Sequence, residues 1–173
     1  GGLGDVYKRQ DGAYDYIIRT PETNVDPGMP GDTTGKTYKI SAYLSDGTYL
    51  WAHDMGPGIE PGIWYSPFIV YDFNGDGKAE VACKTAPGTI DGKGNYVLMN
   101  DDDPTKDYRA DGKNAGIVTS GPEYLTVFNG ETGAEIVTVE YSPRRGNSKD
   151  SVSEDQSLLN YRRHSDNIHI ATT

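Results

Sequence analysis

The most informative part of the chain reads Asp72-Phe73-Asn74-Gly75-Asp76-Gly77-Lys78-Ala79-Glu80. Its oxygen-bearing side chains recur at alternate positions, a spacing that lets the chain wrap around a cation. Gly77 supplies the sharp turn that such a loop requires. Because Ca²⁺ prefers many flexible oxygen ligands, we predict a calcium site here, and a merely acidic turn is the alternative. The predicted ligands are Asp72, Asn74, Asp76, the Lys78 carbonyl and Glu80.

The segments on both sides of this loop predict β-strands. Short alternating runs rich in Val, Ile, Tyr and Thr recur along the chain, separated by Gly, Asp, Asn and Pro. An EF-hand would instead place helices beside the loop and its closing Glu further along. We therefore predict an all-β fold with little helix. The expected strands are 15–19, 38–44, 49–53, 68–71, 79–84, 124–128 and 135–141.

The loop has an earlier counterpart in the sequence. Asp11-Gly12-Ala13-Tyr14-Asp15 is echoed 65 positions later by residues 76–80, and each copy leads to a predicted hairpin, turning at 45–47 and 129–133. Four antiparallel strands repeated at such spacing are typical of a β-propeller blade. We predict one complete four-stranded blade plus part of the preceding one. In the first copy, Asp11, the Ala13 carbonyl and Asp15 could form a truncated calcium site.

The two ends of the chain do not follow this pattern. Tyr7 and Arg9 stand where a complete first loop would need acidic residues. Residues 1–10 are typical of non-native adaptor sequence, so we predict that they lie outside the fold. Residues 11–146 are expected to form the propeller fragment with the calcium loop. Beyond them the alternation fades, which predicts a divergent or disordered tail over 147–173.

Composition excludes several classes of partner. Acidic residues outnumber basic ones by 26 to 16 in this chain of 173 residues, a formal net charge of −10. Such a charge repels phosphate backbones and anionic membrane surfaces, so we expect neither nucleic acid nor membrane as a partner. No apolar run reaches the roughly 20 residues that span a bilayer. Cys83 is the single cysteine, which excludes a disulfide within the chain.

Three segments resemble polysaccharide lyase family 11, the rhamnogalacturonan lyases. They are residues 70–86, which contain the acidic loop, residues 121–130, and the hairpin at 42–51. The resemblance implies an eight-bladed β-propeller, of which this chain would be a fragment. It also implies a secreted or periplasmic enzyme that uses Ca²⁺ to cleave the backbone of rhamnogalacturonan I, an acidic plant cell-wall polysaccharide, by β-elimination.

That reaction sets requirements for the site. Removal of the C5 proton of a uronate needs positive charge on the neighbouring carboxylate, which Ca²⁺ can provide, and a base within reach of the proton. Lys84, at the end of a strand near the acidic loop, is a candidate base, with a solvated edge lysine as the alternative. His53 is a second candidate, with an ordinary hairpin histidine as the alternative.

Other residues are candidates for substrate or metal contacts. Asn24 and Asp26, in a loop rich in Pro and Gly, could supply oxygens or only form a turn. Trp64 and Tyr65 could stack on sugar rings or pack between blades. Glu123 could be a further metal ligand. Residues 101–103, all Asp, could form a second calcium locus or a solvated acidic run.

Two other classes of protein share acidic loops of this kind. A calcium-stabilised, non-catalytic adhesion or scaffold propeller would account for the loop as well. It would not account for the resemblance over 70–86 and 121–130, which favours the lyase. A dockerin-like interaction module would require helices beside the loops, and the sequence predicts strands.

Overall fold

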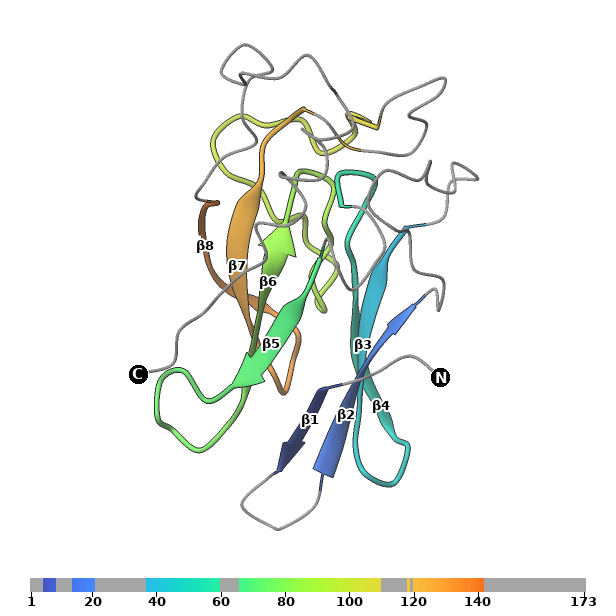
Figure 1. Ribbon diagram of the computed structural model, residues 1–173, viewed down its shortest axis with the longest axis vertical. Helices are drawn as coiled ribbons and strands as arrows, with labels where there is room; N and C mark the ends of the chain where they lie inside the picture. Colours follow the sequence, from blue (N-terminus) through green and yellow to red (C-terminus); the bar gives the residue numbers. More distant parts are fainter. Residues whose placement is uncertain are drawn as a thin grey trace, which may run out of the picture.

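The computed structural model describes residues 5–8, 14–20, 37–59, 66–109, 118 and 120–141. These residues form two four-stranded antiparallel sheets (Figure 1). The described ranges contain no helix, which confirms the predicted all-β class. It follows that no helix in this part of the chain is long and apolar enough to cross a membrane.

The strands of each sheet follow one another in chain order. The first sheet consists of β1 (Asp5–Lys8), β2 (Tyr14–Thr20), β3 (Lys39–Tyr43) and β4 (Tyr49–Asp54). The second consists of β5 (Phe68–Tyr71), β6 (Glu80–Thr85), β7 (Tyr124–Asn129) and β8 (Glu135–Glu140). Every strand predicted from alternation is present, with bounds that differ by at most one residue at either end.

The first sheet differs from the prediction in one respect. Residues 1–10 were expected to lie outside the fold, yet Asp5–Lys8 pair with β2 as strand β1. The first sheet therefore has four strands rather than part of a blade. The prediction was wrong because it rested on the absence of acidic residues from this segment. A strand pairs with a sheet edge through its main-chain groups, whatever its side chains. The predicted tail, 147–173, lies outside the described residues.

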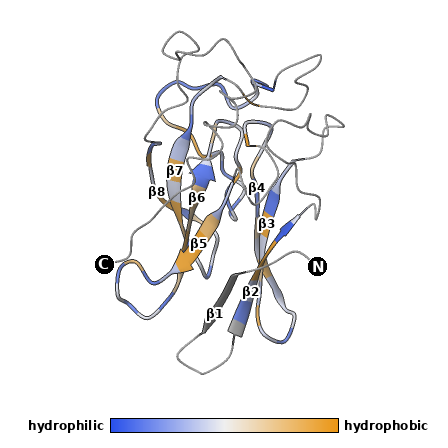
Figure 2. Ribbon diagram, in the orientation of Figure 1, coloured by the Kyte–Doolittle hydropathy of each residue, from blue (hydrophilic) through white to orange (hydrophobic). Residues whose placement is uncertain are grey.

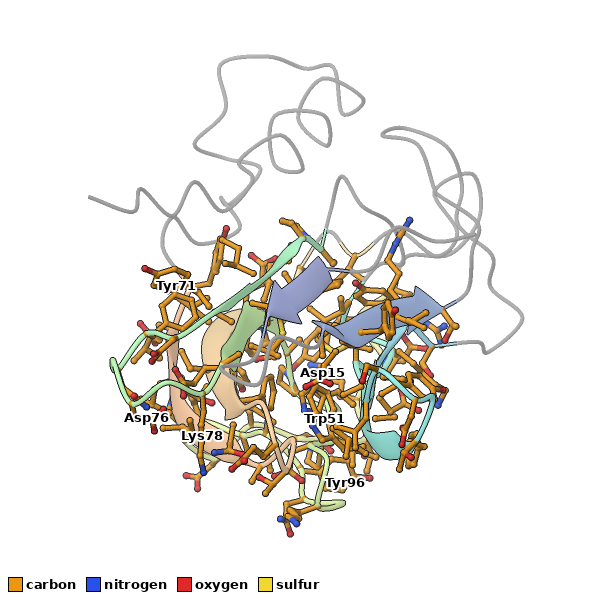
Figure 3. The ribbon with its side chains drawn as sticks, turned by 90° about the horizontal axis from the view of Figure 1, so that it is seen from below. Asp15, Trp51, Tyr71, Asp76, Lys78 and Tyr96 are labelled. Carbon is orange, nitrogen blue, oxygen red and sulfur yellow. The ribbon has the colours of Figure 1, made fainter. Side chains whose placement is uncertain are left out.

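A shared core joins the two sheets. Ile40, Ala42 and Trp51 of the first sheet pack in one cluster with Val81 and Phe128 of the second. Strand alternation explains this, because every second side chain of these strands points toward the neighbouring sheet. Figure 3 shows Trp51 in the interior, and Figure 2 shows the apolar sequence of β5.

Two hydrogen bonds cross between the sheets at the β7–β8 turn. The Trp51 indole Nε1 donates to the Gly130 carbonyl at 2.8 Å, and His53 Nε2 lies 2.8 Å from the Gly133 carbonyl. Gly133 has φ +67°, and a Cβ there would lie 2.7 Å from Trp51 Cδ2. At Gly130 a Cβ would lie 2.1 Å from the Ala79 carbonyl oxygen. Both glycines are therefore required for the close approach of the sheets.

His53 is a core residue rather than a base open to substrate. Its ring stacks on Trp51 with centroids 4.3 Å apart and lies 4.0 Å from the ring of Phe128. Within the described structure its Nδ1 has no hydrogen-bond partner. Burial lowers the pKa of His53 to about 4, since a buried imidazolium would lack solvation. The ring is therefore neutral near pH 7 and donates from Nε2 to Gly133.

We predict that His53 makes stability depend on pH. Its pKa is 6.5 in the unfolded state and about 4 when folded, so the unfolded chain takes up the proton first as the pH falls. Stability should be complete above pH 6.5 and decrease toward pH 4, by about 3 kcal/mol in all. Thermal unfolding across this range should show the loss.

The matched control is His53→Gln, which keeps a donor for the Gly133 carbonyl but does not titrate. The carboxylates contribute equally to both proteins, so the difference between the two pH profiles isolates the histidine. Parallel profiles for the wild type and the variant would contradict this role for His53.

Candidate functional site

The acidic loop connects β5 to β6, and the carboxylate of Asp72 organises it. Asp72 Oδ1 accepts hydrogen bonds from the amides of Gly75 (2.7 Å) and Asp76 (3.1 Å), and Oδ2 accepts from Gly77 (2.8 Å). Gly75 and Gly77 have φ values of +77° and +86°. Glycine adopts this left-handed region without strain, so the loop can coil around one side chain.

The other predicted ligands close the same loop. Glu80, buried at the start of β6, accepts hydrogen bonds from the Phe73 amide at 2.9 Å and the Asn74 Nδ2 at 3.1 Å. Asn74 Oδ1 accepts from the Asp76 amide, and Asp76 Oδ1 accepts from the Lys78 amide, both at 2.8 Å. The structure therefore brings the predicted residues into one compact loop at the periphery of the molecule, where Figure 3 shows Asp76 and Lys78.

The charge of this loop is not balanced by the described residues. The ion pairs among them do not include Asp72, Asp76 or Glu80, and Lys78 Nζ bonds Glu131 at 2.9 Å. Asp76 Oδ2 accepts no hydrogen bond within the described structure, and each Glu80 oxygen accepts one and keeps a free lone pair. This all-oxygen donor set suits a hard divalent cation.

The arrangement of these donors is not a preformed cluster. No group of three Asp, Glu, His or Cys side chains in the described part of the chain converges on one metal position. The predicted set includes the Asn74 amide and the Lys78 carbonyl, and its carboxylates accept hydrogen bonds from main-chain amides here. The residues fit Ca²⁺ by chemistry, and the calcium assignment stays a prediction.

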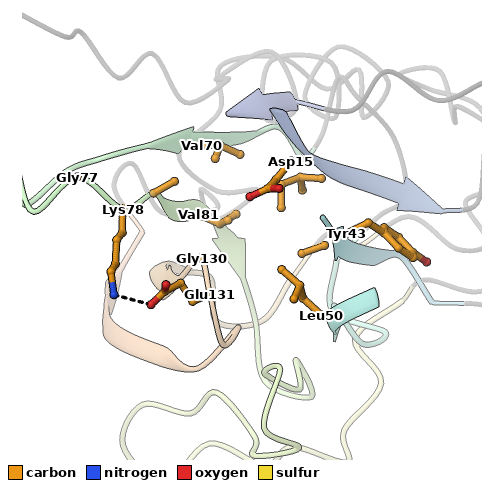
Figure 4. A pocket seen from close by; sticks show the side chains of 12 residues that line it. Asp15, Tyr43, Leu50, Val70, Gly77, Lys78, Val81, Gly130 and Glu131 are labelled. Atoms are coloured by element: carbon orange, nitrogen blue, oxygen red, sulfur yellow. Dashed lines mark hydrogen bonds and ion pairs between the residues drawn. The ribbon is translucent and has the colours of Figure 1, made fainter. Parts of the chain in front are cut away.

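Of the three predicted ligands in the earlier counterpart of the loop, only Asp15 is described. This half-buried residue lines a cavity of about 70 Å³ between the two sheets, with Leu50, Val70 and Val81 among its walls (Figure 4). The ion pair between Lys78 and Glu131 lies at the same cavity. Asp11 and Ala13 lie outside the described residues, so the truncated calcium site stays a prediction.

Lys84 does not lie beside the acidic loop. Glu80 at the loop pairs with Asn129, whereas the other end of β6 pairs with Tyr124, so Lys84 is about 13 Å along the strand from Glu80. Its Nζ bonds Glu123 Oε1 at 3.1 Å, and both side chains are buried. The structure therefore contradicts the predicted position beside the loop, and it contradicts a solvated edge position because β6 is a central strand and the Lys84 side chain is buried.

Glu123 is therefore engaged by Lys84, at the end of the sheet opposite the loop. Two of the aspartates at 101–103 also have partners. Asp102 accepts a hydrogen bond from the Tyr124 hydroxyl. Exposed Asp103 accepts from the hydroxyl and amide of Thr105, which lower its pKa. Asn24, Asp26, Trp64 and Tyr65 lie outside the described residues.

Asp91 is a residue that sequence reasoning missed. Its carboxylate accepts hydrogen bonds from the amides of Lys93 (2.8 Å), Asn95 (2.9 Å) and Glu135 (3.2 Å). Burial alone would raise the pKa of Asp91, but these hydrogen bonds outweigh it and lower the pKa. Asp91 thereby ties the long β6–β7 connection to β8. The Asp91-Gly92-Lys93-Gly94-Asn95 turn was the available signal.

Comparison with known proteins gives a consistent result. Residues 2–155 match the family described as rhamnogalacturonan lyase family 11, C-terminal domain. The rhamnogalacturonan exolyase YesX of Bacillus subtilis (strain 168) is 46% identical over 149 residues, which are 86% of this chain and 22% of that protein. The rhamnogalacturonan endolyase YesW of the same organism is 46% identical over 148 residues, with the same coverage.

Solved structures of this kind resemble the fold described above. The crystal structure of the exotype lyase YesX matches with a TM-score of 0.75 and 44% identity, over 86% of this chain and 24% of that one. The Bacillus licheniformis rhamnogalacturonan lyase PL11 matches with a TM-score of 0.75 and 43% identity, over 88% and 25%. The chain thus spans 22% of the length of the curated relatives it matches.

We predict that the loop binds Ca²⁺ in preference to Mg²⁺. Its several flexible oxygens suit a shell of about six to eight ligands better than the small octahedral shell of Mg²⁺. Calorimetric titration of chelator-treated protein should give binding heat with Ca²⁺ and little with Mg²⁺. No calcium heat, or equal responses to the two ions, would remove the assignment.

Asp76→Ala should destabilise the protein more than Asp103→Ala in calcium. The first change removes a predicted ligand and the acceptor of the Lys78 amide, and couples loss of metal to loss of loop structure. The second removes an exposed side chain that bonds only Thr105. Melting temperatures in calcium and in chelator measure the difference. Equal melting temperatures for both variants in calcium would contradict the prediction.

Proposed function

The chain belongs to rhamnogalacturonan lyase family 11, and on that basis we propose that it is part of a calcium-dependent lyase acting on rhamnogalacturonan I. The reaction is cleavage of the rhamnose-galacturonate backbone by β-elimination. The match over residues 2–155 carries this proposal. A plant cell-wall polysaccharide is too large to enter a cell, so we place the enzyme outside the cell or in the periplasm.

We further propose that the two sheets are successive blades of an eight-bladed propeller. Each has four antiparallel strands in chain order, and β1 contacts β5, so the first strands of the two sheets are neighbours. Two blades of eight are a quarter of such a propeller, in agreement with coverage of 24% and 25% of the solved lyase chains.

The role of the acidic loop follows from its residues. Asp72, Asn74, Asp76, the Lys78 carbonyl and Glu80 would hold Ca²⁺. Bound Ca²⁺ supplies positive charge, which in this reaction class neutralises a uronate carboxylate and makes the C5 proton acidic. Asp72 and Glu80 already fix the loop backbone through main-chain amides. These hydrogen bonds hold the loop in place, which is what the described residues contribute to the proposed metal site.

We propose that Lys84 is not the base of this reaction. A general base must come within about 3 Å of the proton that it removes. The Lys84 ammonium is buried and ion-paired with Glu123, with the Tyr141 ring centroid 5.9 Å away. We propose that Lys84 and Glu123 instead position the start of β7. The base is then expected in another part of the parent enzyme.

A non-catalytic scaffold or adhesion propeller is the alternative. The buried position of Lys84 favours this alternative, because a candidate base that is ion-paired and buried is not accessible to a substrate. The two proposals can be tested by placing this chain within a full-length lyase, because the lyase assignment predicts turnover by that hybrid enzyme and the scaffold alternative does not.

We predict that the 173-residue chain alone has no lyase turnover on rhamnogalacturonan, because a propeller site is assembled from loops of several blades. By contrast, a hybrid in which residues 2–155 of this chain replace the matching segment of the exolyase YesX should release unsaturated uronate in the presence of calcium. Ultraviolet absorbance measures this release. Asp76→Ala in the hybrid should lower turnover by on the order of tenfold or more through lost metal affinity.

Asp103→Ala in the hybrid is the matched control and should leave turnover unchanged. A folded, calcium-binding hybrid without turnover would contradict the lyase assignment and favour the scaffold. Turnover by the isolated chain would contradict the claim that other blades complete the site. Circular dichroism verifies the fold of each protein.

A further inference from the structure

The sequence contains two Asn-Gly pairs, Asn74-Gly75 and Asn129-Gly130. An asparagine followed by glycine is prone to succinimide formation, in which the main-chain nitrogen of the following residue attacks the side-chain amide carbon. Glycine favours this reaction because it has no side chain to hinder the approach of its nitrogen. The surrounding hydrogen bonds decide whether a given pair reacts, and they differ between the two pairs.

The Asn74-Gly75 pair lies exposed in the acidic loop, and the side-chain amide of Asn74 is held at both ends. Its Oδ1 accepts a hydrogen bond from the Asp76 amide at 2.8 Å, and its Nδ2 donates to Glu80 Oε1 at 3.1 Å. The first contact spans two residues and folds the side chain back toward the Gly75 peptide. The attacked carbon and the attacking nitrogen are therefore kept near each other.

Two neighbouring groups meet the chemical requirements of the reaction. The Gly75 amide donates to Asp72 Oδ1 at 2.7 Å, and a carboxylate in this position can accept the proton that the attacking nitrogen loses. The Asp76 amide donates to Asn74 Oδ1, the atom on which negative charge develops as the nitrogen adds to the amide carbon. The loop thus supplies both a base and a donor to the developing oxyanion.

The second pair has the oxyanion donors but not the base. Asn129 Oδ1 accepts hydrogen bonds from the amides of Glu131 at 3.1 Å and Thr132 at 2.9 Å. The difference lies at the attacking nitrogen, because the Gly130 amide donates at 3.0 Å to the Ala79 carbonyl, which is not a base. Asn129-Gly130 is therefore a matched internal control for Asn74-Gly75.

We propose that Asn74 is a site of spontaneous deamidation, promoted by Asp72 and by the Asp76 amide. A bond forms between the Gly75 nitrogen and Asn74 Cγ, the proton of that nitrogen passes to Asp72, and Nδ2 leaves as ammonia with a proton from water. A second water molecule opens the succinimide to aspartate or isoaspartate, and Asp72 returns its proton to solvent. Overall, an amide and water become a carboxylic acid and ammonia.

The two products change the loop in different ways. Aspartate adds a negative charge to a loop whose acidic residues take no part in the ion pairs of the described structure. Isoaspartate lengthens the main chain by one atom and removes the turn that joins Asn74 to Asp76. Any effect on calcium binding rests on the proposed calcium site, whereas the deamidation itself does not depend on it.

Peptide mass spectrometry of the aged 173-residue chain tests this proposal. One sample is kept folded at physiological pH and temperature, with a chelator that keeps metal ions from Asp72, and a second sample is kept in urea. The peptide with Asn74 should gain about 1 Da, on the order of tenfold or more faster in the folded chain than in urea. Asn129 should react in urea and stay unmodified in the folded chain.

A variant separates the action of Asp72 from simple exposure of the loop. Asp72→Asn removes the base but keeps an acceptor for the Gly75 amide, so it should slow the reaction at Asn74 by on the order of tenfold or more. Asp103→Ala, which changes an exposed carboxylate outside the loop, should leave the rate unchanged. An unmodified Asn129 in the same digest verifies that each variant is folded.

Any of three results would overturn the proposal. The first is an Asn74 that reacts no faster in the folded chain than in urea. The second is an Asn129 that is modified as fast as Asn74 in the folded chain. The third is a folded Asp72→Asn variant that reacts at the wild-type rate.

Discussion

The structure depends on the contact of Trp51 and His53 with the glycine-containing turn between β7 and β8. The two aromatic rings pack between the sheets, and their ring nitrogens form hydrogen bonds with the main-chain carbonyls of Gly130 and Gly133. These residues have no side chain that would block the approach of the rings. The apolar packing is non-directional, whereas the two hydrogen bonds fix how far one sheet can slide along the other. The acidic loop, Asp91 and the long β6–β7 connection are all positioned relative to this seam.

Much of this architecture could be predicted from the sequence because alternation and turn residues act locally. Both hairpins and the strands around the acidic loop follow from patterns a few residues long. The features that could not be predicted depend on which strands become neighbours. Lys84 is buried because β6 lies between β5 and β7, and β1 exists because β2 offers it an edge. Such pairings are properties of the sheet and leave no periodic trace in the sequence.

The candidate site shows the same division. The oxygen donors of residues 72–80 and their glycines were evident in the sequence, and the structure places them in one coiled loop. The contacts of Glu123 with Lys84, of Asp102 with Tyr124 and of Asp91 with Glu135 were not evident, because each joins residues far apart in the chain. Acidic residues in this protein therefore include some that accept hydrogen bonds from main-chain amides, some that pair with buried cationic side chains, and some that are predicted to bind a cation from solution.

Gly130 has a consequence for how the molecule can be observed. Its amide donates to the Ala79 carbonyl at the end of the acidic loop (3.0 Å), and its own carbonyl accepts from the Trp51 indole (2.8 Å). A displacement of Ala79 is thereby transmitted through one residue to the acceptor of a buried chromophore. Because indole emission responds to its hydrogen bonding, the fluorescence of Trp51 is expected to report on the shape of the acidic loop.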